Sequence, residues 1–175
     1  MTTTSNALTT RDEFREVVRN KIRALGEHYD PEANQVLFTL VRAANLLTTD
    51  LDSTVWRPFG VSYAGFRVIF TIWVTGPLEP RTIARLASVS RASISSVINT
   101  LERDGYVIRK RESKDRRLVT VDLTEKGREL WHDSFEGHNA REKRWASALD
   151  AEEQQTLVDL LQRLIRGRPR GAEDD

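Results

Sequence analysis

The stretch from Ser90 to Leu123 constrains the fold most, because it predicts one amphipathic helix followed directly by a basic β-hairpin. Ser90 is a favourable N-cap residue, and Gly105 is typical of the position just past a helix C-terminus. Between them, apolar side chains recur at helical spacing and predict one buried face: Ile94, Val97, Ile98 and Leu101. The helix is therefore expected to begin after Ser90 and to end before Gly105.

The opposite face of this helix is small and hydrogen-bonding, and it is neutral until its last turn. It carries Ala92, Ser96, Asn99, Thr100 and Arg103, with Ser93 and Ser95 at its edges. Solvated helix faces are usually rich in Lys and Glu, whereas small polar side chains let a helix enter the major groove of DNA. There Asn can pair with adenine, and Ala or Thr can touch the thymine methyl group. A protein-interaction surface is the alternative, and the helix alone leaves both open.

The hairpin that follows the helix favours DNA. Residues 106–109 and 118–123 are rich in strand-forming side chains, and the hairpin carries Arg111, Lys114, Arg116 and Arg117. Cationic side chains on a hairpin can neutralise phosphates or enter a narrow minor groove. Asp115 is close enough to Arg117 to orient its guanidinium. A solvated basic loop is the alternative for the hairpin alone, but its attachment to this helix makes DNA contact the better interpretation.

The charge of the chain is unevenly distributed. The 175 residues carry a formal net charge of only +1, whereas residues 81–128 hold twelve Lys or Arg against six Asp or Glu. A basic segment inside an otherwise acidic chain indicates a local binding surface for a polyanion. The length suits one domain with a substantial core.

Several classes of function are excluded or unsupported. The chain has no cysteine, which rules out disulfides, thiolate metal sites and thiol redox sensing. It has none of the common phosphate-binding, hydrolase or zinc-protease motifs, so it is expected not to be an enzyme and to need no cofactor. No apolar run approaches the length of a membrane span, and no secretory signal opens the chain. We therefore expect a cytoplasmic protein with no membrane partner.

The remaining chain predicts further helices. Thr10 with Glu13 fits a capping box for a helix reaching Gly26, and Asp30-Pro31 begins a long apolar helix that ends before Pro58. Ser62 can cap a helix that Gly76 closes. A short helix from Arg81 to Ala87 follows, although Glu79 is a poor N-cap. After the hairpin, Thr124 predicts a helix to about Leu149, and the Asp150/Glu153 capping box predicts a last helix that stops at Gly167.

Together these motifs resemble consecutive signatures of the MarR family of winged-helix transcription regulators. The resemblance covers about residues 60 to 130, and it rests on Phe66–Ile69, Gly76–Leu78, Val89–Ser95, Leu101–Tyr106, Asp115–Arg117 and Leu123–Gly127. It implies a mainly α fold with a small β wing, in which a winged helix-turn-helix lobe is joined to N- and C-terminal dimerisation helices. One departure is Ser96, where family members often carry Arg, so base recognition here is expected to rely more on the wing and on DNA shape.

The resemblance also implies a domain organisation. Residues 1–9 and 168–175 are expected to be disordered, and residues 59–123 to form the DNA-binding lobe. Residues 10–58 would supply an N-terminal extension and the first dimerisation helix, and residues 124–167 the C-terminal dimerisation helices. The apolar faces of these helices are expected to pack against a second copy of the chain. A two-fold dimer would read a pseudo-palindromic operator.

Candidate binding residues follow from these expectations. We expect the major groove to be contacted by Ser90, Arg91, Ser93, Ser95, Ser96 and Asn99. Arg117, oriented by Asp115, is expected to enter the minor groove. The DNA phosphates are expected to be contacted by Arg81, Arg109, Lys114 and Arg116. The family places an effector pocket between the dimer helices and the lobe, where this chain has Trp56, Phe59, Tyr63, Arg67, Phe70 and Trp73. Core packing is the alternative for each of these aromatic residues. Aromatic rings with one cation suit a small aromatic or carboxylate ligand.

The histidines raise the question of a metal sensor. His132 and Glu136 are four residues apart on one helix face, but no spacing among His28, His132 and His138 resembles a dedicated metal site. We therefore expect no metal. His138, on an apolar stripe, is interpreted as a hydrogen-bonded interface residue.

The sequence thus predicts a homodimeric regulator, a repressor by analogy with the common family behaviour. Its affinity for a palindromic operator would be modulated by a small ligand. The main alternative is a winged-helix protein-interaction module without sequence-specific DNA binding.

Overall fold

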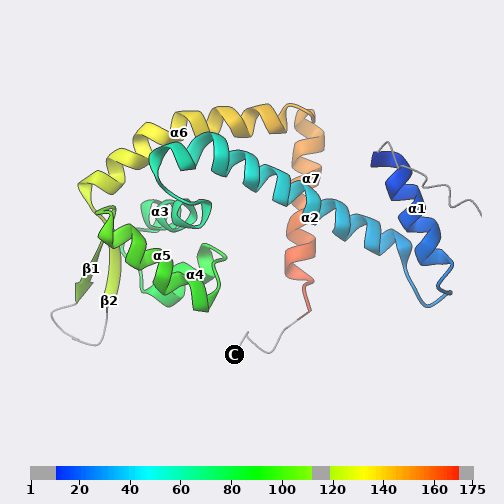
Figure 1. Ribbon diagram of the computed structural model, residues 1–175, viewed down its shortest axis with the longest axis horizontal. Coiled ribbons are helices and arrows are strands. Elements are labelled where there is room, and N and C mark those ends of the chain that lie inside the picture. The colour runs from blue at the N-terminus through cyan, green and yellow to red at the C-terminus, as the bar shows by residue number, and fades with distance from the viewer. Residues whose placement is uncertain (1–10, 112–118, 170–175) are drawn as a thin grey trace, which may run out of the picture. The chain divides into compact units, whose positions relative to one another are not determined.

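The structure is a computed structural model, and it describes residues 11–111 and 119–169. The chain forms two compact units, which meet in sequence between Thr49 and Asp50. The first unit holds one helix and most of a second. The second unit holds the remaining helices and a two-stranded antiparallel sheet (Figure 1).

The first unit contains α1 (Arg11–Arg23) and the greater part of α2 (Pro31–Leu51). Asp30 caps α2 as expected, because its Oδ1 accepts a hydrogen bond of 2.8 Å from the backbone N–H of Ala33. Phe14 of α1 packs near Phe38 of α2, with ring centroids 6.0 Å apart. The first helix ends at Arg23, before the expected Gly26, which adopts a φ of 129° that favours glycine.

A stripe of apolar side chains on α2 stays exposed in this single chain. Val36, Leu37 and Val41 are 54%, 53% and 57% exposed. Burying such side chains is the main favourable term in folding and association, so a stripe left open indicates a surface that another element or chain covers.

The second unit begins with a break in the helix. A π-helical turn, η1 (Asp52–Trp56), and a 3₁₀ turn, η2 (Arg57–Phe59), lead to Gly60, whose φ is 74°. The α-helix ends at Leu51, earlier than the break expected at Pro58, because the π-helical turn begins at Asp52; Gly60 then ends the 3₁₀ turn in a left-handed conformation. The chain then forms α3 (Tyr63–Thr75), whose N-cap Ser62 accepts from the backbone N–H of Gly65.

The next elements form a helix-turn-helix and a wing. They are α4 (Pro80–Leu86), α5 (Arg91–Arg103), β1 (Val107–Arg111) and β2 (Val119–Leu123). Val107 pairs with Leu123 and Arg109 with Val121. Leu78, in the connection before α4, exchanges two backbone hydrogen bonds with Val121 and so ties the wing to the helices. Glu79 provides no side-chain cap for α4, as expected from its residue type.

Two helices complete the second unit. Thr124 caps α6 (Glu125–Ala146), and Asp150 with Glu153 forms the predicted capping box of α7 (Ala151–Arg166). The helix α6 ends before the expected Leu149, because the chain must leave helical geometry before Asp150 can act as an N-cap. No residue of α7 is buried in this chain.

The core of the second unit lies where α3, α4, α5, β2 and α6 meet. Its completely or almost completely buried side chains include Trp56, Val68, Ile69, Ile72, Ile83, Ile98, Val107 and Val121. Because the apolar face of α5 supplies Ile94, Ile98 and Leu101 to this core, its polar face is directed outward.

Candidate nucleic-acid interface

The position of α5 is fixed by a tight turn and by its cap. Ser88 adopts a φ of 48°, and the backbone N–H of Val89 donates to the carbonyl of Ala84 at 2.9 Å. Ser90 then accepts a hydrogen bond of 3.1 Å from the backbone N–H of Ser93. The turn and the cap together set the direction in which α5 leaves α4.

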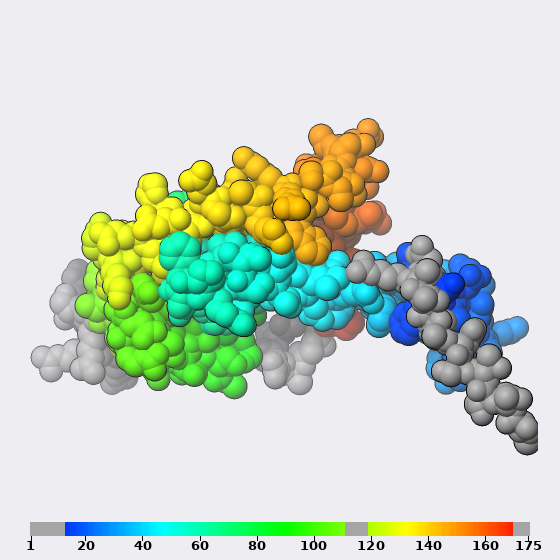
Figure 2. Space-filling model, turned by 45° about the horizontal axis from the view of Figure 1, so that its top comes forward, coloured from blue at the N-terminus to red at the C-terminus, as the bar shows by residue number. Residues whose placement is uncertain are grey.

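The outward face of α5 carries the side chains predicted to meet DNA. Ser95, Ser96 and Asn99 are exposed, as are Ala92 and Thr100. Figure 2 shows the green segment that includes α5 at the surface of the molecule. The face is small and polar, so a second macromolecule can approach the helix backbone closely.

Two of the predicted serines also serve the helix itself. The Ser90 hydroxyl donates to the Ser93 hydroxyl at 2.8 Å while it accepts from the Ser93 backbone. Both side chains remain exposed. Their first role is therefore to hold the start of α5, where any contact with a partner would be made by an already ordered turn.

The structure places Arg109 against α5 and pairs it with protein groups. Its guanidinium forms an ion pair with Glu102, and its Nη2 donates to Asn99 Oδ1 at 2.6 Å. The backbone N–H of Arg109 also donates to Glu102 Oε1 at 3.2 Å. Arg109 was expected to contact a phosphate, and its guanidinium is engaged within the protein in this structure.

Two other predicted cations, Arg81 and Arg91, are exposed on the helix-turn-helix. Arg81 is 82% exposed at its side chain and pairs with Glu79 at 2.6 Å. Arg91 is exposed in the first turn of α5. Lys114, Asp115, Arg116 and Arg117 lie outside the described residues. The wing tip therefore stays a prediction from the sequence.

The junction between α5, the wing and α6 contains residues that sequence reasoning missed. Lys126 Nζ donates to the carbonyl of Asp104 at 2.8 Å, beside the C-terminus of α5, and lies 4.8 Å from the centre of the Tyr106 ring. Cations stabilise helix C-termini, because the last carbonyl groups there carry partial negative charge. The sequence around Lys126, two residues after the N-cap Thr124, did not predict this contact, because Lys126 and Asp104 lie 22 positions apart.

The wing carries an ion-paired carboxylate near its base. Asp122 is 7% exposed, and its Oδ2 lies 2.7 Å from Lys110 Nζ across the two strands. Burial alone would raise the pKa of Asp122, but Lys110, the Leu123 backbone and Arg128 together lower it below its usual value. This carboxylate holds the two strands together at the end nearest α6.

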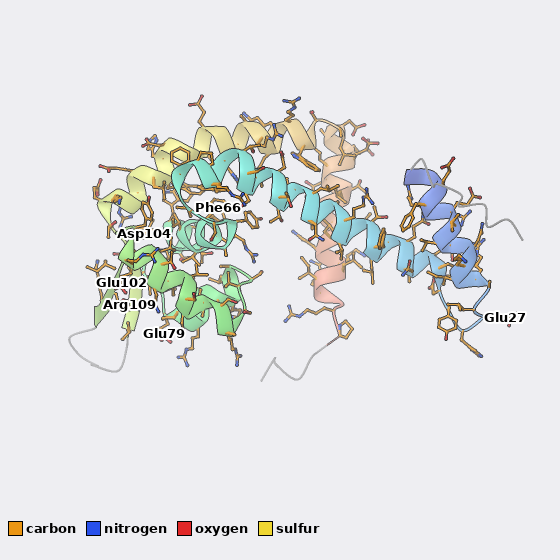
Figure 3. The ribbon with its side chains drawn as sticks, viewed as in Figure 1. Glu27, Phe66, Glu79, Glu102, Asp104 and Arg109 are labelled. Atoms are coloured by element: carbon orange, nitrogen blue, oxygen red, sulfur yellow. The ribbon has the colours of Figure 1, made fainter. Side chains whose placement is uncertain are left out.

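An aromatic stack joins α3 to α6 behind the DNA-facing helices. Trp56 stacks on Phe66 with ring centroids 3.9 Å apart, and Phe66 lies 5.7 Å from Trp131 and 4.6 Å from His138. Burial lowers the pKa of His138, while Glu142, 3.1 Å from its Nε2, opposes this shift. The position of Phe66 in α3 is labelled in Figure 3.

Beside this stack, α3 and α6 form an open hollow of about 570 Å³. Its lining combines three aromatic rings with polar and charged side chains: Trp73, Trp131, His132, Phe135, Glu136, Asn139, Ala140 and Lys143. The sequence signalled Trp73 by its place in an aromatic cluster. Of these α6 residues, the sequence pointed only to His132 and Glu136, as candidate metal ligands, because the proximity of α6 to Trp73 depends on packing.

Three of the residues predicted to bind an effector surround Phe66, whose ring centroid lies 3.9, 5.9 and 6.0 Å from those of Trp56, Tyr63 and Phe70. Trp56 is completely buried, with its Nε1 unpartnered, whereas Phe59 and Phe70 are 38% and 42% exposed. Arg67 lies over the Tyr63 ring at 5.7 Å. Trp73 lines the hollow directly, and Phe70 lies next to it, with its ring centroid 6.4 Å from that of Trp73 and 5.4 Å from that of Trp131.

Neither a metal centre nor a membrane span is found in the described part of the chain. Within residues 11–111 and 119–169, no three His, Cys, Asp or Glu side chains are grouped as metal ligands. The helices described in the same ranges are all too short or too polar to cross a bilayer.

Three comparisons bear on this arrangement. The model of the MarR family matches residues 61–119. Over 138 residues, the chain is 30% identical to YwaE, an uncharacterized HTH-type transcriptional regulator of Bacillus subtilis. The aligned residues make up 79% of this chain and 81% of YwaE. The chain is also 30% identical to the HTH-type transcriptional regulator MhqR of Bacillus subtilis, over 74% of this chain and 89% of MhqR.

A solved structure shares the fold. BpsR of Bordetella bronchiseptica, whose DNA binding is regulated by 6-hydroxynicotinic acid, superimposes with a TM-score of 0.68 and 22% identity. The superposition covers 74% of this chain and 98% of BpsR.

Proposed function

This chain belongs to the MarR family of transcriptional regulators, and from that premise we propose that it is a repressor that binds a pseudo-palindromic operator as a homodimer. A small aromatic or carboxylate ligand would modulate its affinity for DNA. We assign DNA binding to residues 59–123 and dimerisation to helices within residues 10–58 and 124–167.

The exposed polar face of α5 carries this proposal. Ser95, Ser96 and Asn99 lie on a helix whose opposite side is anchored in the core, so the face is presented by a rigid element. Small side chains permit close approach to base edges in the major groove. The cations that the sequence places in the hairpin would meet the phosphates or the minor groove beside it.

Exposed apolar faces support the dimer. Leu157, Leu160 and Leu164 of α7 are 43%, 47% and 44% exposed although they recur on one helix face. A second copy of the chain would bury them. In a two-fold dimer of helix-turn-helix proteins, the recognition helices lie about 34–36 Å apart, which matches one turn of DNA.

The hollow between α3 and α6 supports a response to a ligand. Trp73, Trp131 and Phe135 offer stacking surfaces, while His132 and Lys143 can meet an anionic group. Because α3 packs against α4, α5 and α6, an occupant that shifts α3 would shift α5 with it. Such a ligand changes DNA affinity only if it binds the two arrangements differently. BpsR, of the same fold, responds to an aromatic acid.

Selection of bound duplexes from a random DNA library tests the central proposal. We expect enrichment of an inverted repeat whose half-site centres are separated by about one helical turn. Ser96→Glu adds a negative charge to the exposed face of α5 and should weaken binding to that repeat at least tenfold. Gln162→Glu adds the same charge on α7 and should leave binding unchanged.

The outcomes separate the regulator from the alternative. No enriched sequence, together with equally weak binding to all duplexes, would contradict operator recognition and favour the protein-interaction module. Equal losses in Ser96→Glu and Gln162→Glu would show that charge alone, rather than the face of α5, governs binding.

A further inference from the structure

We propose that Arg109, held by Glu102, fixes the side-chain amide of Asn99 so that it offers DNA chiefly its Nδ2 hydrogens. Asn99 would then recognise a hydrogen-bond-accepting base edge, guanine above all, instead of pairing with adenine. This inference rests on the proposed operator binding and specifies one determinant of its base preference.

The contact between Arg109 and Asn99 determines how the amide is turned. Nη2 of Arg109 lies 2.6 Å from Oδ1 of Asn99. A guanidinium carries five N–H donors and has no acceptor, so only the oxygen of the amide can face it. The Nδ2 group must therefore point away from Arg109. Since Asn99 lies on the exposed face of α5, its amino group is the part left for a partner.

Glu102 keeps the guanidinium in this place. It lies one helical turn after Asn99 on α5, and it forms an ion pair with Arg109 of β1 (Figure 3). Its Oε1 also accepts from the backbone N–H of Arg109 at 3.2 Å, which ties the strand itself to the helix. The Arg109 and Glu102 side chains are 32% and 37% exposed, so the pair is partly shielded from water.

The fixed amide changes which bases Asn99 can recognise. Pairing with adenine requires the amide to accept from N6–H and to donate to N7 at the same time. Here one of the two lone pairs of Oδ1 already accepts a charge-assisted hydrogen bond from Arg109, which restricts how adenine N6–H can approach that oxygen and disfavours the paired geometry. Guanine presents two acceptors, N7 and O6, to a donor in the major groove. Thymine presents only O4, so guanine is the best match.

The test uses the operator found by selection, with each base pair of one half-site replaced in turn. Asn99→Ala identifies the position that Asn99 contacts, as the one where discrimination disappears. At that position the wild-type protein should prefer guanine about fivefold or more over adenine, as expected for one good side-chain contact. Arg109→Ala releases the amide, and the preference should move towards adenine. In Asn99→Ala/Arg109→Ala that shift should be absent.

A second variant keeps the Arg109 contact and reverses the hydrogen-bonding character of position 99. In Asn99→Asp, one carboxylate oxygen can still face Arg109 while the other offers DNA an acceptor. We expect the preference to change from guanine to cytosine, whose N4 amino group is a donor. This variant retains an ion-pairing partner for Arg109, so it remains informative if Arg109→Ala fails to fold.

The salt dependence of binding separates positioning from phosphate contact. If Arg109 acts through Asn99, Arg109→Ala should leave the slope of log affinity against log salt concentration unchanged. A lost phosphate contact would reduce that slope by about one. A reduced slope with an unchanged base preference would overturn the inference.

Three further results would overturn it. The first is that the wild-type protein prefers adenine at the Asn99-dependent position. The second is that wild type and Arg109→Ala have the same base preference there. The third is that an otherwise specific operator contains no Asn99-dependent position. Each leaves operator binding itself standing. Failure of the selection to enrich any sequence would contradict operator binding and this inference together.

Discussion

Gly127 shows how a single residue position can be fixed by a distant backbone. It lies in the first turn of α6, where the chain passes close to the end of α5. A Cβ at this position would lie 2.1 Å from the carbonyl oxygen of Tyr106. That oxygen accepts a hydrogen bond from the backbone N–H of Thr124 at 3.1 Å, so it is held in place. Only glycine fits this contact.

Replacing Gly127 should therefore destabilise the protein. Gly127→Ala forces the backbones of α6 and Tyr106 apart, and we expect a loss of about 1–3 kcal/mol or more in the free energy of unfolding, as for other overpacked sites. Gly137→Ala on the same helix is the matched control, because a Cβ there meets no atom within 4 Å. It should stabilise the helix by about 0.5–1 kcal/mol. Urea unfolding of both variants measures the difference, and equal effects would contradict the steric argument.

Among the contacts between elements, the side-chain carboxylate of Asp50 links the C-terminal end of α2 to α6 through hydrogen bonds. Asp50 accepts from Arg141 Nε at 2.5 Å and from Trp145 Nε1 at 2.7 Å, and Arg141 Nη2 donates to its other oxygen. The hydrogen bonds from Arg141 and Trp145 lower the pKa of Asp50 to about 2. Asp50 lies just before the helix break at η1, so these hydrogen bonds join α6 to the chain at that break.

The low pKa of Asp50 predicts how stability changes in acid. In the unfolded chain the pKa of Asp50 is near its ordinary value of 3.8, whereas in the folded protein the pKa is about 2. The stability that the ionised Asp50 carboxylate contributes to the folded protein is therefore complete above about pH 4, and it is lost as the pH falls through about 2. Asp50→Asn should be less stable than wild type at pH 7, and the difference should narrow on acidification.

Urea unfolding from pH 7 to pH 2 measures this difference. Asp133→Asn, at an exposed position of α6, is the matched control and should follow the wild-type pH profile. A constant difference between wild type and Asp50→Asn at every pH would show that the carboxylate contributes through packing alone.

At the scale of the whole molecule, the apolar face of α7 predicts self-association. We expect Leu164→Glu to place a charge in the dimer interface and to convert the protein to a monomer. Because a monomer engages only one half-site, operator affinity should fall at least tenfold. Gln162→Glu, which lies on the opposite side of α7, should remain dimeric.

Analytical ultracentrifugation together with operator titration tests this prediction. A monomeric wild-type protein, or a dimeric Leu164→Glu variant with full operator affinity, would exclude α7 from the interface.

Local sequence patterns predicted most helices and both strands, many with boundaries within a few residues of those observed. Ser62, Ser90, Thr124 and Asp150 were recognisable as caps, because a capping hydrogen bond joins residues only a few positions apart. The outward face of α5 could be predicted for the same reason, since helical periodicity is a local property. The order of the motifs also predicted the winged-helix fold, which the comparisons confirm.

The packing of the elements, by contrast, fixed which of the predicted side chains contact one another. Arg109 turned out to face Asn99 and Glu102, and Trp56 to be enclosed between Phe66 and His138. The hollow beside Trp73 likewise combines α3 with α6, far apart in sequence. These contacts depend on how helices and strands pack once their apolar faces are buried, and a sequence pattern spanning a few residues carries no record of that packing.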